Sequence, residues 1–240
     1  MTNIKTLGHK HPLSQMIAEI NHIFAKIGFE FAEGPEREFI TYNFDKLNVP
    51  KDHPSRDMQD TFYLSDNPEL VMRTHTSPVQ VRYMEKHTAP IKMICPGKVF
   101  RNEATDATHE AQFFQLEGLW IDKDVSLGHM KGVLEYFFSE FFGGDVSVRF
   151  RPSFFPFVEP GVEVDMMIKK NDTNKLSGRW IEVMGAGMVH PNVLTAAGID
   201  AEKYQGFAFG MGIDRLGVLK YGIDDIRNSY NGDLRFVSQF

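Results

Sequence analysis

The 240-residue chain has little cysteine, no long apolar run and no excess of positive charge. Cys95 is its only cysteine, which excludes an internal disulfide and a cysteine-rich zinc site. No apolar stretch resembles a membrane span or a signal peptide, so we expect a cytoplasmic protein without membrane contact. The formal net charge of −6 argues against broad, salt-driven nucleic-acid binding. A local basic patch or a partner chain could still supply such contacts.

Common catalytic signatures are also missing. No nucleophile and base stand at a recognisable spacing, and no Walker-type loop is present. The glycines of residues 206 to 212 fail the dinucleotide fingerprint, because Arg215 stands where its third glycine would be. Phenylalanine, by contrast, is abundant at 21 residues, which predicts an unusually aromatic core or pocket. The length allows one large domain or two small ones.

Residues 99 to 122 predict two strands joined by a polar loop. Alternate side chains of a strand point to the same face, so Arg101 and Glu103 should share one face of the first strand. A polar face with an apolar backing predicts the floor of a binding site. On the second strand the polar face carries Phe113, Gln115 and Glu117, and the side chains directed to the core are Phe100, Phe114, Leu116 and Trp120.

Helical spacing of apolar residues predicts one helix from Pro12 to about Gly28 and another from about residue 126 to 142. The strand-like residues 29 to 34 follow the first helix and end at Pro35. This helix and strand are either a packing surface for another subunit or an edge of the core, and the pattern favours the core. The apolar stripe of the second helix is also assigned to the core: Leu127, Met130, Leu134, Phe137, Phe138 and Phe141.

Between these helices, residues 40 to 60 predict an ordered loop, and residues 61 to 75 predict a hairpin turned at residues 66 to 68. Ser77, Pro78 and Gln80 then have the spacing of a capping box at a helix start. A structural role is the simplest interpretation of Ser77 and of His75, which lies two residues earlier.

The second half of the chain begins with a clean alternating strand at residues 146 to 151. Phe155, Phe157 and Glu159 should share one face of the next strand, which Pro156 makes bulged or places at an edge. Two phenylalanines beside a carboxylate indicate either a core with a charged rim or an aromatic pocket. A further strand, residues 178 to 191, contains a run of small residues (185 to 187) that lets a ligand or another backbone come close.

Residues 206 to 227 predict a strand that turns directly into a helix. Arg215 would stand at the helix N-terminus, where backbone N–H groups and a guanidinium together favour an anion. Arg101 and Arg215 are then two candidate phosphate ligands on separate elements. With carboxylates and an aromatic pocket but no nucleophile, the chain favours phosphoryl or nucleotidyl transfer, driven by positioning and charge stabilisation.

These segments resemble the class II aminoacyl-tRNA synthetases. The helix and strand ending at Pro35 are similar to their motif 1, FRNE to motif 2 and GFAFGMGIDRL to motif 3. RTHTSP, QFFQLEG, FFPFVEPGVEVD and GAGMVHP match the family of bacterial phenylalanyl-tRNA synthetase α subunits, over nearly the whole chain. The resemblance implies an α+β fold with an antiparallel sheet flanked by helices. It divides the chain into a lead-in, residues 1 to 11, and one catalytic domain, residues 12 to 240.

The resemblance also implies activation of phenylalanine by ATP and transfer to tRNA(Phe), with Mg²⁺. In that family's scheme Arg101 holds the α-phosphate and substrate carboxylate, Arg215 the far phosphates, and Glu103 helps to order these contacts. Phe113 stacks on adenine and His109 lies near the nucleotide. The amino-acid head group would be bound by His75, Ser77, Gln115 and Glu117. The phenyl ring would contact Phe155 and Phe157, and Ala208 and Gly210 would form the base of that pocket. Glu159 would bind Mg²⁺.

A β subunit is the implied partner, in an α2β2 enzyme, with a homodimer as the alternative for the isolated chain. The chain departs from the family pattern at three points. The family's N-terminal coiled-coil arm does not precede motif 1, which makes autonomous tRNA binding doubtful. Residues 65 to 71 form a short turn where some relatives have a longer hairpin, and Gln59 stands where some relatives carry tryptophan. Two other functions remain: a binding module that does not aminoacylate, and a synthetase for another amino acid, which Phe155, Phe157 and Ala208 disfavour.

Overall fold

The computed structural model describes residues 8–57, 60–144, 146–169 and 178–240. Its centre is a seven-stranded sheet in the order β1-β5-β6-β10-β9-β8-β7. All neighbours are antiparallel except β1 and β5, which are parallel. The predicted α+β class with a largely antiparallel sheet is therefore confirmed. The strands are β1 (Glu30–Phe31), β5 (Ile91–Phe100), β6 (Gln112–Asp122), β7 (Val146–Phe155), β8 (Val158–Ile168), β9 (Ile181–Val189) and β10 (Gln205–Gly212).

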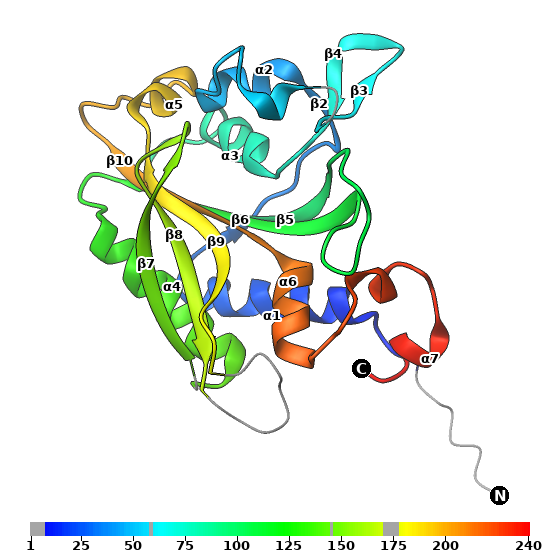
Figure 1. Ribbon diagram of the computed structural model, residues 1–240. Coiled ribbons are helices and arrows are strands. Elements are labelled where there is room, and N and C mark those ends of the chain that lie inside the picture. The colour runs from blue at the N-terminus through cyan, green and yellow to red at the C-terminus, as the bar shows by residue number, and fades with distance from the viewer. Residues whose placement is uncertain (1–7, 58–59, 145, 170–177) are drawn as a thin grey trace, which may run out of the picture.

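Helices cover both faces of this sheet (Figure 1). One face carries α1 (Pro12–Lys26), α4 (Leu127–Phe142) and α6 (Ile213–Tyr221). The other face carries α2 (Ile40–Asn43), α3 (Ser77–Met84) and α5 (Pro191–Ala196), with the short 3-10 helix η1 (Asp45–Leu47). The remaining helical turns are η2 (Pro54–Arg56), η3 (Ile226–Ser229) and α7 (Leu234–Val237). No helix in the described ranges is long and apolar enough to cross a membrane.

The first face buries an aromatic core, as the abundance of phenylalanine predicts. The ring of Phe24 on α1 stacks on Phe137 of α4 at 4.9 Å and on Phe209 of β10 at 5.5 Å, measured between centroids. Such pairs add about 0.5–1.5 kcal/mol to the burial of the rings. Both predicted long helices are confirmed. Leu127 is an exception within the α4 stripe: it stands in the first turn, 39% exposed, and does not join the core.

His11 is the N-cap of α1 and links its start to the C-terminal part of the chain. Its Nδ1 accepts from the backbone N–H of Leu13 at 3.2 Å, and its Nε2 contacts the carbonyl of Ser229 at 3.0 Å. Residues 8 to 11 form no helix or strand, and residues 1 to 7 of the predicted lead-in lie outside the described residues.

The second face is where the sequence prediction needs correction. Residues 40 to 60 are not a plain loop, because the described part contains α2, η1 and η2. Their helical turns are too short to show a hydrophobic period, yet Phe44, Leu47 and Val49 are buried in the core. Gln59 lies outside the described residues.

A smaller three-stranded sheet, β2-β4-β3, flanks this face. It contains β2 (Arg37–Phe39), and the predicted hairpin is confirmed as β3 (Tyr63–Leu64) and β4 (Asn67–Met72). The turn is shorter than predicted, since Asn67 and Pro68 already belong to β4. Before it, the predicted strand at residues 29 to 34 is reduced to the two residues of β1.

Candidate active site

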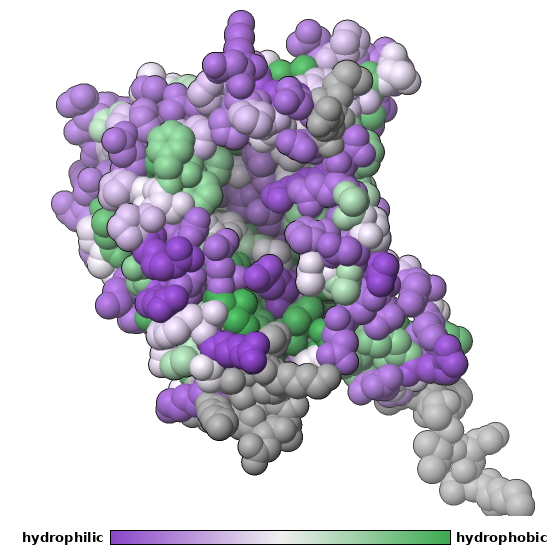
Figure 2. All heavy atoms as spheres, viewed as in Figure 1, coloured by the Kyte–Doolittle hydropathy of each residue, from purple (hydrophilic) through white to green (hydrophobic). Residues whose placement is uncertain are grey.

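A cavity of about 690 Å³ opens on the α3 side of the sheet, above β6, β10 and β9. Figure 2 shows the surface hollowed here, with polar residues around the opening. All predicted site residues line the cavity except His109 and Glu159. The residues brought together are His75, Ser77, Arg101, Glu103, Phe113, Gln115, Glu117, Phe155, Phe157, Ala208, Gly210 and Arg215.

The cationic end of the cavity is formed by Arg101 and Arg215. Arg101 donates from Nε to the carbonyl of Thr74 at 3.1 Å, and its guanidinium lies 5.1 Å from the ring centroid of Phe113. Burial lowers the pKa of Arg101, which still leaves the guanidinium charged, and Glu103 opposes that shift from 3.9 Å. Arg215, in the first turn of α6, is exposed. The two charges therefore border a space that can take a polyanion.

Arg101 and Glu103 do not share a strand face as predicted, because β5 ends at Phe100. Both follow it in irregular chain, and the Nε bond to Thr74 fixes the direction of Arg101 instead. On β6 the predicted alternation holds: Phe113, Gln115 and Glu117 line the cavity while Leu116 is buried in the opposite core.

Asp214 joins the two elements that carry the cationic end. Strand β10 ends at Gly212, which pairs with Gln115 of β6. Beyond that pair, the backbone N–H of Phe114 on β6 donates to Asp214 Oδ2 at 2.8 Å. The hydroxyl of Tyr230 donates to the other oxygen, Oδ1, at 2.6 Å. Burial raises the pKa of this carboxyl, and the two hydrogen bonds oppose the shift. Asp214 thus ties its own chain neighbour Arg215 to Phe113, which precedes the donor Phe114 on β6.

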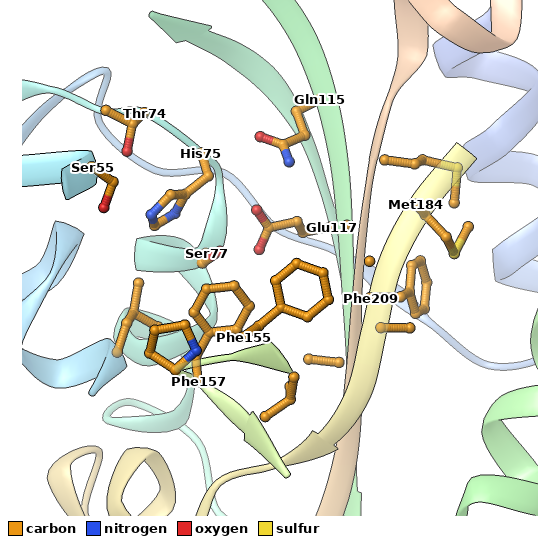
Figure 3. Close-up of a pocket in the computed structure, with 18 of the residues that line it drawn as sticks. Ser55, Thr74, His75, Ser77, Gln115, Glu117, Phe155, Phe157, Met184 and Phe209 are labelled. Atoms are coloured by element: carbon orange, nitrogen blue, oxygen red, sulfur yellow. The ribbon is translucent and has the colours of Figure 1, made fainter. Parts of the chain in front are cut away.

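Glu117 is the centre of the polar site (Figure 3). It is 3% exposed and accepts from the backbone N–H of Thr76 at 3.1 Å and from Gln80 Nε2 at 2.8 Å. Burial raises its pKa to about 7, although hydrogen bonds from Ser77 and Thr76 work against that rise. A carboxylate in such surroundings gains strongly from a cationic ligand.

The predicted capping box at Ser77 is wrong. Thr76 is the N-cap of α3, and it makes no side-chain cap hydrogen bond. Ser77 and Gln80 both donate hydrogen bonds to Glu117 instead. A buried carboxylate without donors would be costly, and the helix already begins at Thr76. The polar pair that suggested a cap is therefore part of the site.

His75 presents an unused polar atom to the cavity. Its Nδ1 is buried and has no hydrogen-bond partner within the described part of the chain, as is also true of Gln115 Oε1. Burial, together with the charges of Arg101 and Arg73, lowers the pKa of His75 to about 3, so its imidazole is neutral at physiological pH. Both atoms are available to a polar ligand, and satisfying them would remove a cost of about 1–3 kcal/mol each.

The aromatic end contains Phe155 and Phe157. Their rings are stacked at 19°, with centroids 5.9 Å apart, and Phe157 lies 6.4 Å from the ring of His75. The prediction that they share a strand face with Glu159 is wrong: Phe155 ends β7, and Pro156 and Phe157 form the turn before β8. The register shifts between Ser153 and Phe155, consistent with the bulge that the proline predicts.

Small residues form the base of the aromatic end. A Cβ placed on Gly185 would lie 2.8 Å from Cζ of Phe155, and one on Gly210 would lie 3.1 Å from Cγ of Glu117. These two glycines are cross-strand partners on β9 and β10, with Ala208 beside them. Only residues without side-chain bulk let the ring and the carboxylate approach the sheet so closely.

His109 and Glu159 lie outside the cavity lining. His109 is exposed on the loop between β5 and β6 and contacts Asp106 at 3.1 Å, while the loop itself receives a hydrogen bond at Ala107 O from Ile226 N. Glu159 is exposed, and His190 is its salt-bridge partner at 3.4 Å. No cluster of three or more potential metal ligands occurs among the residues described.

The structure adds cavity residues that the sequence analysis missed. Gln80, which the sequence analysis had assigned to a helix cap, lines the cavity. Asp214 lies outside the lining and supports it through the N–H of Phe114; its place beside Arg215 was the only signal for Asp214 in the sequence. Glu163 and Glu182 also line the cavity, where Arg151 bridges them at 2.8 and 3.5 Å. The alternation of β8 and β9 could have indicated them. Leu47 and Val49 line the aromatic end from a segment without a period.

Comparison with known proteins identifies the fold and the family. The family model described as "tRNA synthetases class II core domain (F)" matches residues 2–240. A solved structure of pyrrolysyl-tRNA synthetase from Desulfitobacterium hafniense has the same fold, with a TM-score of 0.72 and 17% identity, over 95% of this chain and 76% of that one. The fold is that of the class II synthetase core.

The particular family follows from closer relatives. The chain is 54% identical to the phenylalanine--tRNA ligase alpha subunit of Bacillus subtilis (strain 168), over 99% of this chain and 70% of that protein. It is 56% identical to the corresponding protein of Shouchella clausii, over 97% of this chain and 69% of the relative. The chain belongs to the phenylalanine--tRNA ligase alpha-subunit family of class II tRNA synthetases.

Proposed function

We propose that the chain activates L-phenylalanine with ATP and transfers the phenylalanyl group to tRNA(Phe), as the catalytic subunit of a two-subunit enzyme. One observation carries the proposal: a single cavity joins two arginines, a buried carboxylate and an aromatic end. Those three regions match, in order, the phosphates, the ammonium group and the phenyl ring of the reactants.

In the first step, a carboxylate oxygen of phenylalanine attacks the α-phosphorus of ATP. The bond from that phosphorus to the bridging oxygen of the β-phosphate breaks, and pyrophosphate leaves. Arg101 stabilises the charge that develops on the α-phosphate, Arg215 binds the far phosphates, and Phe113 stacks on adenine. Fixed charges that need not reorganise during the reaction are an effective source of rate acceleration.

In the second step, a ribose hydroxyl at the tRNA terminus attacks the acyl carbon, and AMP leaves. During both steps Glu117 binds the ammonium group, with Ser77, Gln115 and neutral His75 completing the head-group contacts. Phe155 and Phe157 contact the phenyl ring above Ala208 and Gly210. Glu103 orders Arg101, and His109 reaches the nucleotide from its loop.

Cavity carboxylates would hold Mg²⁺, which would supply positive charge to offset that of the departing pyrophosphate. Glu163 and Glu182 fit this ion better than Glu159 does, because they line the cavity and Mg²⁺ commonly uses one or two carboxylates together with phosphates. Exposed Glu159 has only a histidine beside it, so its predicted Mg²⁺ site would need ligands from the β subunit or from water.

The family supports a β-subunit partner, and an α2β2 enzyme in the cytoplasm remains the prediction. A homodimer of the isolated chain is the alternative. Mixing the chain with a β subunit and measuring mass by light scattering would distinguish the two assemblies.

Discrimination against tyrosine should be limited at this site. An apolar pocket rejects a ligand with one extra hydroxyl by a factor of only about 10². We therefore expect some activation of tyrosine, with hydrolytic correction elsewhere in the enzyme, which the family assigns to the β subunit.

Amino-acid-dependent ATP–pyrophosphate exchange tests the proposal, run with and without a β subunit. Phenylalanine should support exchange far better than tyrosine or leucine. Absence of exchange even with the β subunit would favour a binding module that does not aminoacylate. Exchange that depends on a different amino acid would instead indicate a synthetase of other specificity.

A further inference from the structure

Asn48 has an unusual backbone conformation next to the aromatic end of the cavity. It closes η1 with φ 58° and ψ 22°, and it is the only non-glycine residue of the described ranges in the left-handed region. That conformation costs most L-residues about 1–2 kcal/mol, and asparagine is among the few that tolerate it. A residue held this way is a candidate for a specific task.

The side chain of Asn48 reaches across the molecule to the aromatic turn. Its Nδ2 donates to the carbonyl of Pro156 at 2.7 Å, although 108 positions separate the two residues. Pro156 lies between Phe155 and Phe157, the two rings of the aromatic end. The next carbonyl, that of Phe157, accepts from the backbone N–H of His190 at 3.0 Å. Two consecutive carbonyls of the turn are thus held from two different segments.

Asn192 fixes the orientation of the Asn48 amide. Its Nδ2 donates to Asn48 Oδ1 at 3.0 Å, which leaves the amide nitrogen of Asn48 facing Pro156. On either side of Asn48, the buried residues Leu47 and Val49 line the cavity. Asn48 itself does not line it, so it can act on a ligand only through its neighbours and the turn.

We propose that Asn48 is a positioning residue for amino-acid selectivity. It joins the segment of residues 45 to 49 to the turn between β7 and β8, and this link sets the position of Phe155 and Phe157 for a benzyl side chain. The inference rests on the proposed function, because it takes the aromatic end as the binding site of the amino-acid side chain.

Asn48→Asp is the most informative variant. Aspartate has nearly the same shape and tolerates the left-handed conformation, but its carboxylate has no N–H to donate to Pro156. Asn48→Gly keeps the backbone conformation without any side chain and without a new charge. If the amide donor matters, both variants should bind phenylalanine less well. If only the backbone conformation matters, both should bind it as the wild type does.

The test is steady-state ATP–pyrophosphate exchange by the enzyme assembled with a β subunit. For Asn48→Asp and Asn48→Gly we expect the KM for phenylalanine to rise about fivefold to tenfold, in line with the loss of one hydrogen bond. The KM for ATP should stay within twofold of the wild-type value. The preference for phenylalanine over leucine, measured as a ratio of kcat/KM, should fall, because leucine depends less on the ring contacts.

Asn231→Asp is the matched control, since it makes the same chemical change on an exposed turn outside the cavity lining. It should leave both KM values unchanged. Wild-type enzyme with no phenylalanine-dependent exchange would overturn the proposed function, and this inference with it. Normal wild-type exchange with an unchanged phenylalanine KM in Asn48→Asp would overturn this inference alone. An equal rise in both KM values would also overturn it, as the sign of a merely structural role.

Discussion

The polar and aromatic ends of the cavity are built in different ways. At the polar end most side chains stand on β6, on α3 and at the junction of β10 with α6, where backbone hydrogen bonds set their spacing. Arg101 follows the end of β5 in irregular chain, and its bond to the neighbouring Thr74 carbonyl directs it. At the aromatic end the rings of Phe155 and Phe157 flank a turn, and Asn48 and His190 hold that turn from distant segments.

This contrast predicts different responses to substitution. Loss of a charge at the polar end should reduce the rate or the binding of a charged group directly, because buried electrostatic contacts are strong. Loss of a contact at the aromatic end should shift several apolar surfaces by small amounts, and selectivity should change more than turnover. The following experiments test this difference.

Replacing Arg101 should have the largest effect. Arg101→Ala should reduce exchange at least about 100-fold, in line with the loss of one transition-state donor. The fold should survive, because the contacts of its side chain with Thr74, Glu103 and the ring of Phe113 all lie within the cavity lining and not in the core. Exposed Arg37, paired with Asp66, supplies the control Arg37→Ala. Near-normal exchange in Arg101→Ala would contradict the assignment of the cationic end.

The ionisation of Glu117 should control phenylalanine binding. Its pKa is raised to about 7, and an ammonium ligand requires the carboxylate form. Affinity should therefore fall about tenfold per pH unit below pH 7 and level off above it. Calorimetric titration from pH 5.5 to 8.5 would measure this dependence. Glu117→Gln should bind weakly at every pH, and 3-phenylpropionate, which has no ammonium group, should show no such rise; a flat profile for phenylalanine would refute the prediction.

The same raised pKa predicts how stability depends on pH without ligand. A carboxyl whose pKa rises on folding stabilises the folded state below its unfolded value of 4.5, and this contribution is lost as pH increases through about 7. The free energy of unfolding should fall by on the order of 3 kcal/mol, at about 1.36 kcal/mol for each unit by which the pKa is raised. Urea unfolding at pH 5 and pH 8 would detect it as a difference between wild type and Glu117→Gln.

The Asp214 link should have a moderate effect that is confined to ATP. Tyr230→Phe leaves one buried carboxylate oxygen without its donor, a cost of about 1–3 kcal/mol. We expect the KM for ATP to rise about fivefold while the KM for phenylalanine is unchanged, since Asp214 precedes Arg215 and is bonded to the N–H of Phe114, the neighbour of Phe113. Tyr63→Phe, which removes a hydroxyl bonded to Arg56 O outside the cavity lining, is the control. An equal rise in both KM values would argue for general loosening instead.

A ring of the aromatic end should contribute least. Phe157→Leu should raise the KM for phenylalanine about threefold, within the 0.5–1.5 kcal/mol of an aromatic pair, and leave kcat unaltered. Phe39→Leu is a matched control, because Phe39 is 48% exposed on β2 and lies outside the cavity lining. A similar effect of both variants would show that Phe157 has no special role.

Much of the fold could be predicted from the sequence because its signals are local. The helices α1 and α4 have long apolar periods, and β6 alternates cleanly between core and cavity. The junction of β10 with α6 was likewise evident from its pattern. Where a segment was short, as at η1, or bent, as at Pro156, no period existed to indicate which residues would be buried.

Side-chain partners were harder to predict for the same reason. Ser77 and Gln80 have the spacing of a helix cap, and only the position of Glu117 on another strand turns them towards the site. The bond from Asn48 to Pro156 joins residues with no local relation at all.

The sequence by itself determined the helices and main strands, the polar face of β6 and the resemblance to one synthetase family. It did so because hydrophobic period and motif spacing are properties of neighbouring residues. Only the tertiary structure decided which donors satisfy Glu117, which segment holds the aromatic turn and that Glu159 lies outside the cavity. Those outcomes depend on burial and on contacts between segments far apart in the chain, where an unpaired polar group is costly and its partner can come from any of them.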